Sequence, residues 1–170
     1  MKRFLSHLID VALYGAIAFA LYSFVSRKLS GPSRGGAAAL FDLPVVGASD
    51  STRFRLADHR GKPVLIEVFA GWCSACRSSA PALVEAFKKH GRRGTTFVGV
   101  SMDNTAADAL RVKRAWGLPY DVVLDDGRLS KDYKIEVLPT FVLVGADGTV
   151  RRVSTGAPSS AEIDRWLTEL

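Results

Sequence analysis

The feature that most constrains this chain is an apolar run followed closely by two cysteines three positions apart. Residues 64–69 read Val-Leu-Ile-Glu-Val-Phe, and such a nearly continuous apolar stretch is typical of a strand buried on both faces. Residues 74–90 then carry apolar side chains at helical spacing and are followed by Gly91, which predicts a helix that ends there. Cys73 and Cys76 therefore lie where a buried strand gives way to the beginning of a helix.

That position gives the two sulfur atoms a chemical role. A thiolate, not a thiol, attacks a disulfide, and the free N–H groups and dipole of a helix N-terminus stabilise a thiolate and lower the pKa of the thiol. We expect Cys73 to be the nucleophile and Cys76, in the first helical turn, to be the resolving thiol that releases a mixed disulfide. Trp72 is expected to lie beside them as an apolar contact surface for a bound peptide.

Two buried cysteines can also be packed in a core without reacting, or can hold a metal ion. A metal site needs further ligands, and His59 and His90, the only histidines after residue 40, do not stand at a ligand spacing from the pair. We therefore expect no dedicated metal site, while transient contact of copper with the dithiol stays open. Because the chain has only two cysteines, a framework of several disulfides is excluded.

The remainder of the chain predicts strands and helices that alternate and then end in a hairpin and a helix. Strands are expected at residues 54–56, 95–101, 121–124, 140–144 and 150–154, and helices at residues 105–116, at residues 129–133 and from a capping box at Ser159 and Glu162 to the end of the chain. This order argues for a mixed sheet with helices on both faces. Met102 and Asp103 follow a strand and are expected to border the active cleft.

The N-terminal segment carries most of the unbalanced positive charge. The net charge is +6, and five basic residues beside one acid lie within the first 40 positions. They flank residues 4–26, where only His7 and Asp10 are ionisable, and a helix of that length spans about 34 Å, enough to cross a hydrocarbon core of about 30 Å. The rest of the chain has no basic cluster interleaved with aromatic residues, so we expect no binding of nucleic acid.

Two interpretations compete for residues 4–26, an uncleaved anchor and a signal peptide cleaved near residues 37–39. The apolar stretch is longer than the roughly 7–15 residues of a signal-peptide core, and the alanines at 37–39 lie well beyond it, so the anchor is favoured. The flanking charges do not fix the orientation; we place the C-terminal domain outside the cytoplasm because an exported anchor followed by a redox domain makes chemical sense. The predicted organisation is an anchor with its flanks at 1–28, a flexible linker at 29–40 and a catalytic domain at 41–170.

The active-site segment also resembles a known family. The run Glu-Val-Phe-Ala-Gly-Trp-Cys-Ser-Ala-Cys-Arg, residues 67–77, resembles the redox segment of the thioredoxin superfamily. Residues 41–170 are similar to its membrane-tethered TlpA/ResA-like branch, which includes ScsD-like proteins, because an extra segment at about 102–135 contains Asp-Asp-Gly-Arg-Leu and residues 133–141 match the loop before the family's hairpin. The resemblance implies a thioredoxin fold, a central mixed β-sheet flanked by helices, preceded by an N-terminal transmembrane helix.

The resemblance also assigns roles to residues outside the cysteine pair. Pro139 matches the family's cis-proline, and a cis bond would put the backbone of Leu138 beside Cys73 to pair with substrate backbone; the alternative is an ordinary trans proline in a turn. Glu67 matches the family's buried acid, which implies that it relays a proton to or from Cys76. The alternative is that Glu67 points to a strand edge and is solvated, since burial of an unpartnered acid is costly.

The sequence departs from the family at two places. Ser74-Ala75 stand between the cysteines without the proline that many reducing members carry, and these positions tune the pKa of the thiol and the reduction potential. Ser79 stands where ResA-like proteins have a glutamate, and the acidic loop of members that mature cytochromes is not evident around Pro139. The redox direction therefore stays open, and a dedicated role in cytochrome c maturation is weakened.

We therefore expect a single-pass protein of the bacterial inner membrane whose catalytic domain is a periplasmic disulfide reductase or isomerase. The resemblance implies exported proteins with disulfides as substrates, a membrane electron donor of the DsbD/ScsB type and no cofactor. The alternatives are a disulfide oxidase of the same fold and a tethered copper-handling module that uses the dithiol as a ligand. A peroxiredoxin lacks support, because neither cysteine lies in the context Pro-x-x-x-Thr/Ser-x-x-Cys.

Overall fold

The structure is a computed structural model of the 170-residue chain, and it describes residues 13–19, 34–49 and 51–170. The chain divides into two compact units, Met1–Gly31 and Pro32–Leu170. In the first unit residues 13–19 are helical, and the rest of the predicted membrane segment at 4–26 lies outside the described residues. Within the described ranges, no helix combines the length and the apolar character needed to cross a bilayer.

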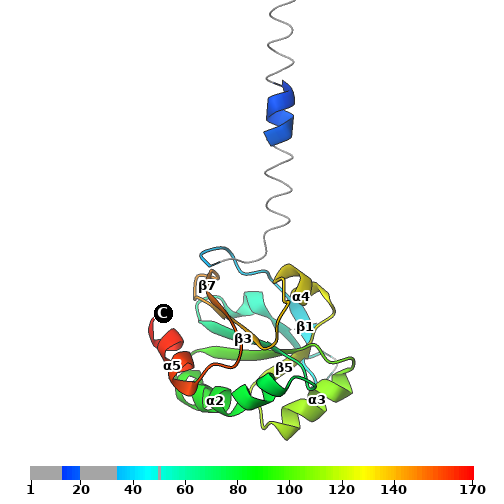
Figure 1. Ribbon diagram of the computed structural model, residues 1–170, viewed down its shortest axis with the longest axis vertical. Helices are drawn as coiled ribbons and strands as arrows, with labels where there is room; N and C mark the ends of the chain where they lie inside the picture. The colour runs from blue at the N-terminus through cyan, green and yellow to red at the C-terminus, as the bar shows by residue number, and fades with distance from the viewer. Residues whose placement is uncertain (1–12, 20–33, 50) are drawn as a thin grey trace, which may run out of the picture. The chain divides into compact units, whose positions relative to one another are not determined.

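The second unit is built around a mixed five-stranded sheet (Figure 1). The strands lie in the order β5-β4-β3-β6-β7. Strands β3, β4 and the edge strand β5 are parallel, whereas β6 runs antiparallel to β3 and the other edge strand, β7, antiparallel to β6. Their bounds are Val64–Phe69 for β3, Thr96–Ser101 for β4, Asp121–Leu124 for β5, Thr140–Val144 for β6 and Val150–Thr155 for β7. The predicted mixed sheet is confirmed.

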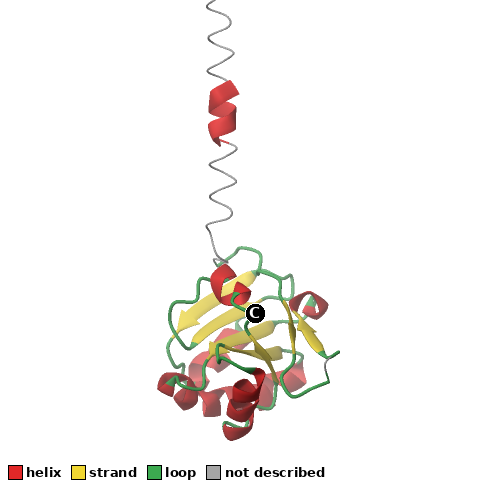
Figure 2. Ribbon diagram, turned by 90° about the vertical axis from the view of Figure 1, so that its right-hand side faces the viewer, coloured by secondary structure: helices red, strands yellow, loops and turns green. Residues whose placement is uncertain are grey.

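Helices lie on both faces of the sheet, as predicted, most of them on one face and the short helix at 128–132, with the N-terminal strands, on the other (Figures 1 and 2). The helices are α2 (Ser74–His90), α3 (Ala106–Ala115), α4 (Arg128–Asp132) and α5 (Ser160–Thr168). Leu65 and Phe69 of β3 join side chains of α2, α3 and α5 in one core cluster, while Val64, Ile66 and Val68 join α4 and the N-terminal strands in a second. All six residues of β3 are buried, so the continuous apolar run marks the strand between the two cores.

Helix α2 has the predicted bounds, but the residue after it does not act as the predicted stop. Cys73 is its N-cap, with extended backbone, and the helix runs from Ser74 to His90 as expected. Gly91 does not stop the chain's helical path: its N–H bonds to the Phe87 carbonyl, and a 3-10 turn follows at Gly91–Arg93. The left-handed residue that ends this path is Gly94, with φ 96°, because a glycine adopts positive φ without a Cβ clash.

The N-terminal part of this unit packs on the second core. Strands β1 (Asp42–Pro44) and β2 (Arg53–Arg55) pair antiparallel. The strand predicted at 54–56 is thus shifted by one residue, since Leu56 already starts a 3-10 turn and donates its N–H to the Phe41 carbonyl. Residues 35–38, assigned from sequence to the linker, also contact the sheet: Gly35 N–H bonds to the Val150 carbonyl, and Ala38 is buried.

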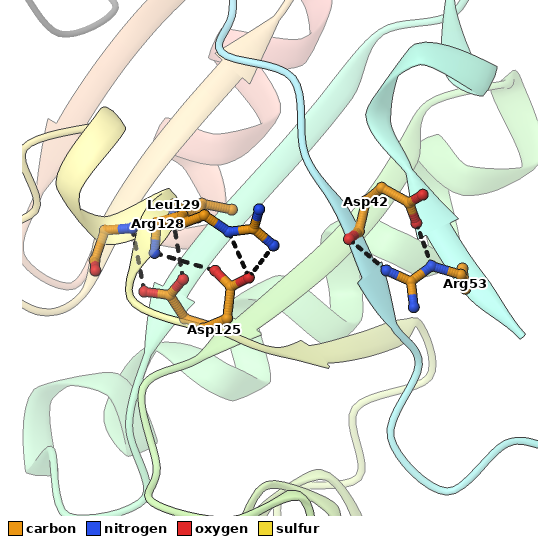
Figure 3. A network of polar contacts seen from close by, with 7 residues as sticks. Asp42, Arg53, Asp125, Arg128 and Leu129 are labelled. Carbon is orange, nitrogen blue, oxygen red and sulfur yellow. Dashed lines mark hydrogen bonds and ion pairs between the residues drawn. The ribbon is translucent and has the colours of Figure 1, made fainter. Parts of the chain in front are cut away.

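The Asp-Asp-Gly-Arg-Leu run forms a tight turn between β5 and α4 (Figure 3). The Asp125 carboxylate accepts the N–H groups of Leu129 at 3.2 Å and Ser130 at 3.1 Å, which satisfies donors at the start of α4. The Arg128 guanidinium pairs with Asp126. This motif therefore has a structural role: it orients α4 ahead of the loop that carries Pro139.

Candidate active site

The two cysteines lie at the N-terminus of α2 and form a disulfide, with their Cα atoms 5.3 Å apart. The N–H of Cys76 donates to Cys73 Sγ at 3.1 Å. In the reduced protein the same N–H and the positive end of the helix dipole face the Cys73 thiolate, so they favour its charge. The geometry suits a pair that alternates between dithiol and disulfide.

The two sulfur-bearing residues differ in access. Cys73 keeps 8% of its surface exposed, whereas Cys76 has none. A substrate disulfide can therefore reach Cys73 from solvent, while Cys76 is reached only from Cys73. This difference favours the predicted roles of nucleophile and resolving thiol, which themselves stay a prediction. Ser74 and Ala75, the predicted redox-tuning positions, are both exposed between the cysteines.

Trp72 forms the exposed wall beside the disulfide. It is 74% exposed, although tryptophan is usually buried for most of its surface. An open cleft of about 560 Å³ runs from Trp72 along α3, past Val112 and the half-buried Trp116. Trp72 thus offers an exposed apolar ring next to Cys73 in sequence, while Asp103, Asp108 and Arg111 also line the cleft; the role of Trp72 as a contact surface for a peptide stays a prediction.

Asp103 holds the loop that precedes Trp72. Its Oδ1 accepts the N–H of Gly71 at 2.9 Å, and its Oδ2 accepts the hydroxyl of the buried Ser101 at 2.7 Å. A Cβ on Gly71 would lie 2.5 Å from Cγ2 of Val112. The absent side chain therefore lets the loop pack against α3 within reach of Asp103. The sequence placed Asp103 at the cleft but did not indicate this bond, which joins residues 32 positions apart.

The Leu138-Pro139 peptide bond is cis, as the resemblance implied, and the trans alternative is wrong. Pro139 is buried, and the half-buried Leu138 packs against the core cluster that includes Cys73. Among the described residues, no backbone hydrogen bond uses the N–H or carbonyl of Leu138. Its backbone is therefore available to a bound chain, in keeping with the predicted substrate-binding role of both residues.

Glu67 is buried in the middle of the sheet, so the solvated alternative is wrong. Its side chain is 2% exposed and lies between Leu65 and Phe69 on the face of β3 that packs against α2. Loss of hydration raises the pKa of Glu67 from its ordinary 4.5 to about 8, and a hydrogen bond from the Tyr120 hydroxyl, 3.1 Å from Oε2, acts in the opposite direction. The other oxygen, Oε1, has no partner among the described residues. Nothing in the sequence pointed to Tyr120.

His59 and His90 make contacts with residues other than the cysteines. His59 stacks on Phe54 and bonds to Thr96, and the buried His90 bonds to Asp164 of α5. In the part of the chain that the structure describes, no three side chains of the metal-binding types His, Cys, Asp and Glu lie together.

Known proteins are similar to this chain in sequence. A profile of the AhpC/TSA family matches residues 35–153, more than half of the chain. The chain belongs to the AhpC/TSA family. Within this thioredoxin-like family, it is 26% identical over 164 residues to the thiol-disulfide oxidoreductase ResA of Bacillus thuringiensis subsp. konkukian, covering 96% of this chain and 93% of the relative. It is 24% identical over 170 residues to the thioredoxin-like protein YneN of Bacillus subtilis, covering 98% of both.

A solved structure is similar in fold and sequence. The thiol:disulfide interchange protein of the thioredoxin family from Chlorobium tepidum TLS superimposes with a TM-score of 0.72 and 28% identity, over 82% of this chain and 98% of that one. The thioredoxin fold predicted from the sequence is thereby confirmed. This AhpC/TSA family member is a redox enzyme of the thiol–disulfide oxidoreductase class.

Proposed function

We propose that this enzyme is a membrane-anchored disulfide reductase or isomerase that acts on exported proteins in the periplasm of a bacterium. The observation that carries the proposal is the redox pair itself: Cys73 is accessible at a helix N-terminus beside the exposed Trp72, and Cys76 is sealed behind it. Such a site accepts a polypeptide disulfide, not a small ligand that would need an enclosed pocket.

The cycle has two exchange steps. The Cys73 thiolate attacks a substrate disulfide, forms an S–S bond to one substrate sulfur and expels the other as a thiolate. Cys76 then transfers its proton to Glu67, and its thiolate attacks Cys73 Sγ. The mixed disulfide breaks, the second substrate sulfur leaves as a thiolate, and the Cys73–Cys76 disulfide seen in the structure remains. The substrate disulfide has gained two electrons, and the enzyme dithiol has lost them.

Renewal of the dithiol requires an electron donor, and the N-terminal segment suggests where it lies. Residues 4–26 are long and apolar enough in sequence to anchor the chain in the inner membrane. A membrane protein of the DsbD/ScsB type is therefore the proposed donor. With the domain on the outer side of that membrane, the proposed substrates are disulfide-containing proteins outside the cytoplasm, where disulfides persist.

The equilibrium reduction potential against glutathione tests the direction of the cycle. A reductase is expected to lie near the thioredoxin value of about −270 mV, because only a low potential lets the dithiol reduce substrate disulfides. A potential near the DsbA value of about −120 mV contradicts the proposal and favours the oxidase alternative. Stoichiometric Cu(I) binding that survives a competing chelator, combined with no reduction of insulin, contradicts it in favour of the copper-handling alternative.

A further inference from the structure

The hydrogen-bond partner of Glu67 is Tyr120, which does not lie on the strand next to β3 but on the far side of it. Tyr120 directly precedes β5, and β4 separates β5 from β3. In the sheet register Glu67 lies opposite Gly99 of β4, which in turn lies opposite Val122 of β5. A Cβ on Gly99 would lie 3.5 Å from Cε2 of Tyr120 and only 2.9 Å from Cε1 of Phe69. The Tyr120 ring therefore lies beside Gly99 of β4, and its hydroxyl reaches the carboxyl group of Glu67 across that strand.

Aromatic packing fixes the Tyr120 ring in this position. The ring is 4% exposed, and its centroid lies 6.0 Å from that of Phe97 and 5.8 Å from that of Phe87. A ring enclosed in this way cannot swing its hydroxyl to solvent without opening the core. The hydroxyl therefore stays at Oε2 of Glu67, 3.1 Å away.

The carboxyl group of Glu67 is consequently asymmetric. Oε2 accepts the Tyr120 hydroxyl, while the buried Oε1 has no partner among the described residues. A buried polar atom without a partner is costly and calls for a reason. Glu67 lies on the face of β3 that packs against α2, in the layer that contains Cys76. The free oxygen is thus the one available to exchange a proton in the layer of the resolving thiol.

We propose that Tyr120 is a positioning residue of the redox cycle: its hydroxyl fixes Oε2 of Glu67 and makes Oε1 the atom that takes the proton from Cys76. The inference rests on the proposed exchange cycle, in which Cys76 must lose a proton before it attacks. In this step the S–H bond of Cys76 breaks, an O–H bond forms at Oε1, and no electron is transferred. The Cys76 thiolate then attacks Cys73 Sγ and expels the substrate thiolate.

The hydrogen bond also sets the proton affinity of the relay. An O–H group donates more strongly to a carboxylate than to a carboxylic acid, so Tyr120 lowers the pKa of Glu67 and partly offsets the effect of burial. Among the buried residues described in this layer, the other titratable groups are Cys73 and Cys76, which titrate only in the reduced protein, and, at the far end of α2, His90, which bonds to Asp164. No charged side chain of α3 or α5 is buried in this core cluster.

The test compares Tyr120→Phe with Tyr133→Phe in the oxidised full-length protein. Tyr133 is a matched control, because its hydroxyl also bonds in a buried place, 2.8 Å from the Ala39 carbonyl, but packs in the opposite core. The infrared band of the protonated carboxyl, assigned by its loss in Glu67→Gln, is titrated with pH. Tyr120→Phe is expected to raise the pKa of Glu67 by about one pH unit, whereas Tyr133→Phe leaves it unchanged.

The second readout is the rate at which Cys76 releases a mixed disulfide formed at Cys73, measured against pH in the same variants. In Tyr120→Phe, the midpoint of the rate-against-pH profile is expected to move to higher pH by the same amount as the pKa of Glu67. In Glu67→Gln, the rate is expected to lose the pH-dependent step that this carboxyl group causes. An unchanged carboxyl titration in Tyr120→Phe overturns the inference even when exchange activity is intact, so its failure is distinct from failure of the proposed reductase. A shifted titration with an unmoved rate profile overturns it as well.

Discussion

At the residue scale, burial decides which groups of the site can react with solvent and which react only with each other. Trp72 is exposed and Cys73 keeps a small part of its surface in contact with solvent, whereas Cys76 and Glu67 are buried. The strand-to-helix transition in the local sequence pointed to Cys73, Cys76 and Trp72, whereas Glu67 was indicated only by the family resemblance, and its burial came from the structure. Tyr120 was not predictable, because its contact with Glu67 depends on the register of three strands.

The first prediction concerns the stability of Glu67→Gln against pH. The pKa of Glu67 is raised from 4.5 to about 8, so between these values the folded protein holds a proton that the unfolded chain releases. Protonated Glu67 therefore contributes its full stabilisation below pH 4.5. As pH rises from 4.5 toward 8, the free energy of unfolding falls by about 1.4 kcal/mol per pH unit. Urea unfolding of the oxidised proteins at a series of pH values measures it. Parallel pH dependence in wild type and Glu67→Gln would contradict this account of Glu67.

The second prediction concerns Gly71→Ala. The new Cβ would lie 2.5 Å from Cγ2 of Val112, so the loop must move away from α3 and weaken its bond to Asp103. We expect a loss of about 1–3 kcal/mol in the free energy of unfolding and slower exchange at Cys73. Gly91→Ala is the control, because its Cβ would meet nothing closer than 3.4 Å and its φ of −59° suits any residue. If Gly71→Ala and Gly91→Ala had equal free energies of unfolding and equal exchange rates, the proposed packing of this loop against α3 would be contradicted.

At the element scale, periodicity and capping signals predicted the central strands and the helices well, and long-range contacts explain the differences. Helix α2 and the capping box of α5 were predicted from neighbouring residues alone. The 3-10 turn after Gly91 was not, and neither was the attachment of residues 35–38 to β7, because small residues such as Gly35 and Ala38 carry no pattern of their own. The conformation of such short segments is determined by their contacts with the rest of the fold and not by their own sequence.

The third prediction is that Ser159→Ala destabilises the protein by about 1 kcal/mol. Ser159 accepts the N–H of Glu162 through its side chain and donates its own N–H to the Glu162 carboxylate at 2.8 Å, so the variant breaks a reciprocal cap at the start of α5. Chemical unfolding measures the change. Ser160→Ala, which removes only an exposed bond to Glu85, is expected to have a smaller effect; equal losses would argue against the cap.

At the scale of the whole molecule, the chain combines a thioredoxin-like domain with an apolar N-terminal segment that we propose as a membrane anchor. The domain, its family and its redox class follow from the cysteine motif, the sheet and the relatives. The sequence predicted that the sheet is mixed but not the order of its strands. That order depends on how helices and loops pack on both faces of the sheet. The proposed anchor rests on the length and apolar character of residues 4–26 and has its own test.

The fourth prediction is that the full-length protein sediments with membranes and resists alkaline extraction, because residues 4–26 are long and apolar enough to span the bilayer. A chain that begins at Pro32, the start of the second compact unit, should remain in the soluble fraction with its disulfide exchange intact. Release of the full-length protein by alkali would contradict the anchor.

The central claim is that Cys73 attacks and Cys76 resolves, and covalent trapping tests it most directly. Reduced Cys76→Ala and Cys73→Ala are each mixed with a disulfide-bonded protein such as insulin, and the products are weighed intact without reductant. Since Cys73 is accessible and Cys76 is not, Cys76→Ala should accumulate a mixed disulfide at Cys73, and Cys73→Ala should remain largely unmodified. Accumulation of the adduct at Cys76 in Cys73→Ala, with none in Cys76→Ala, would contradict the account.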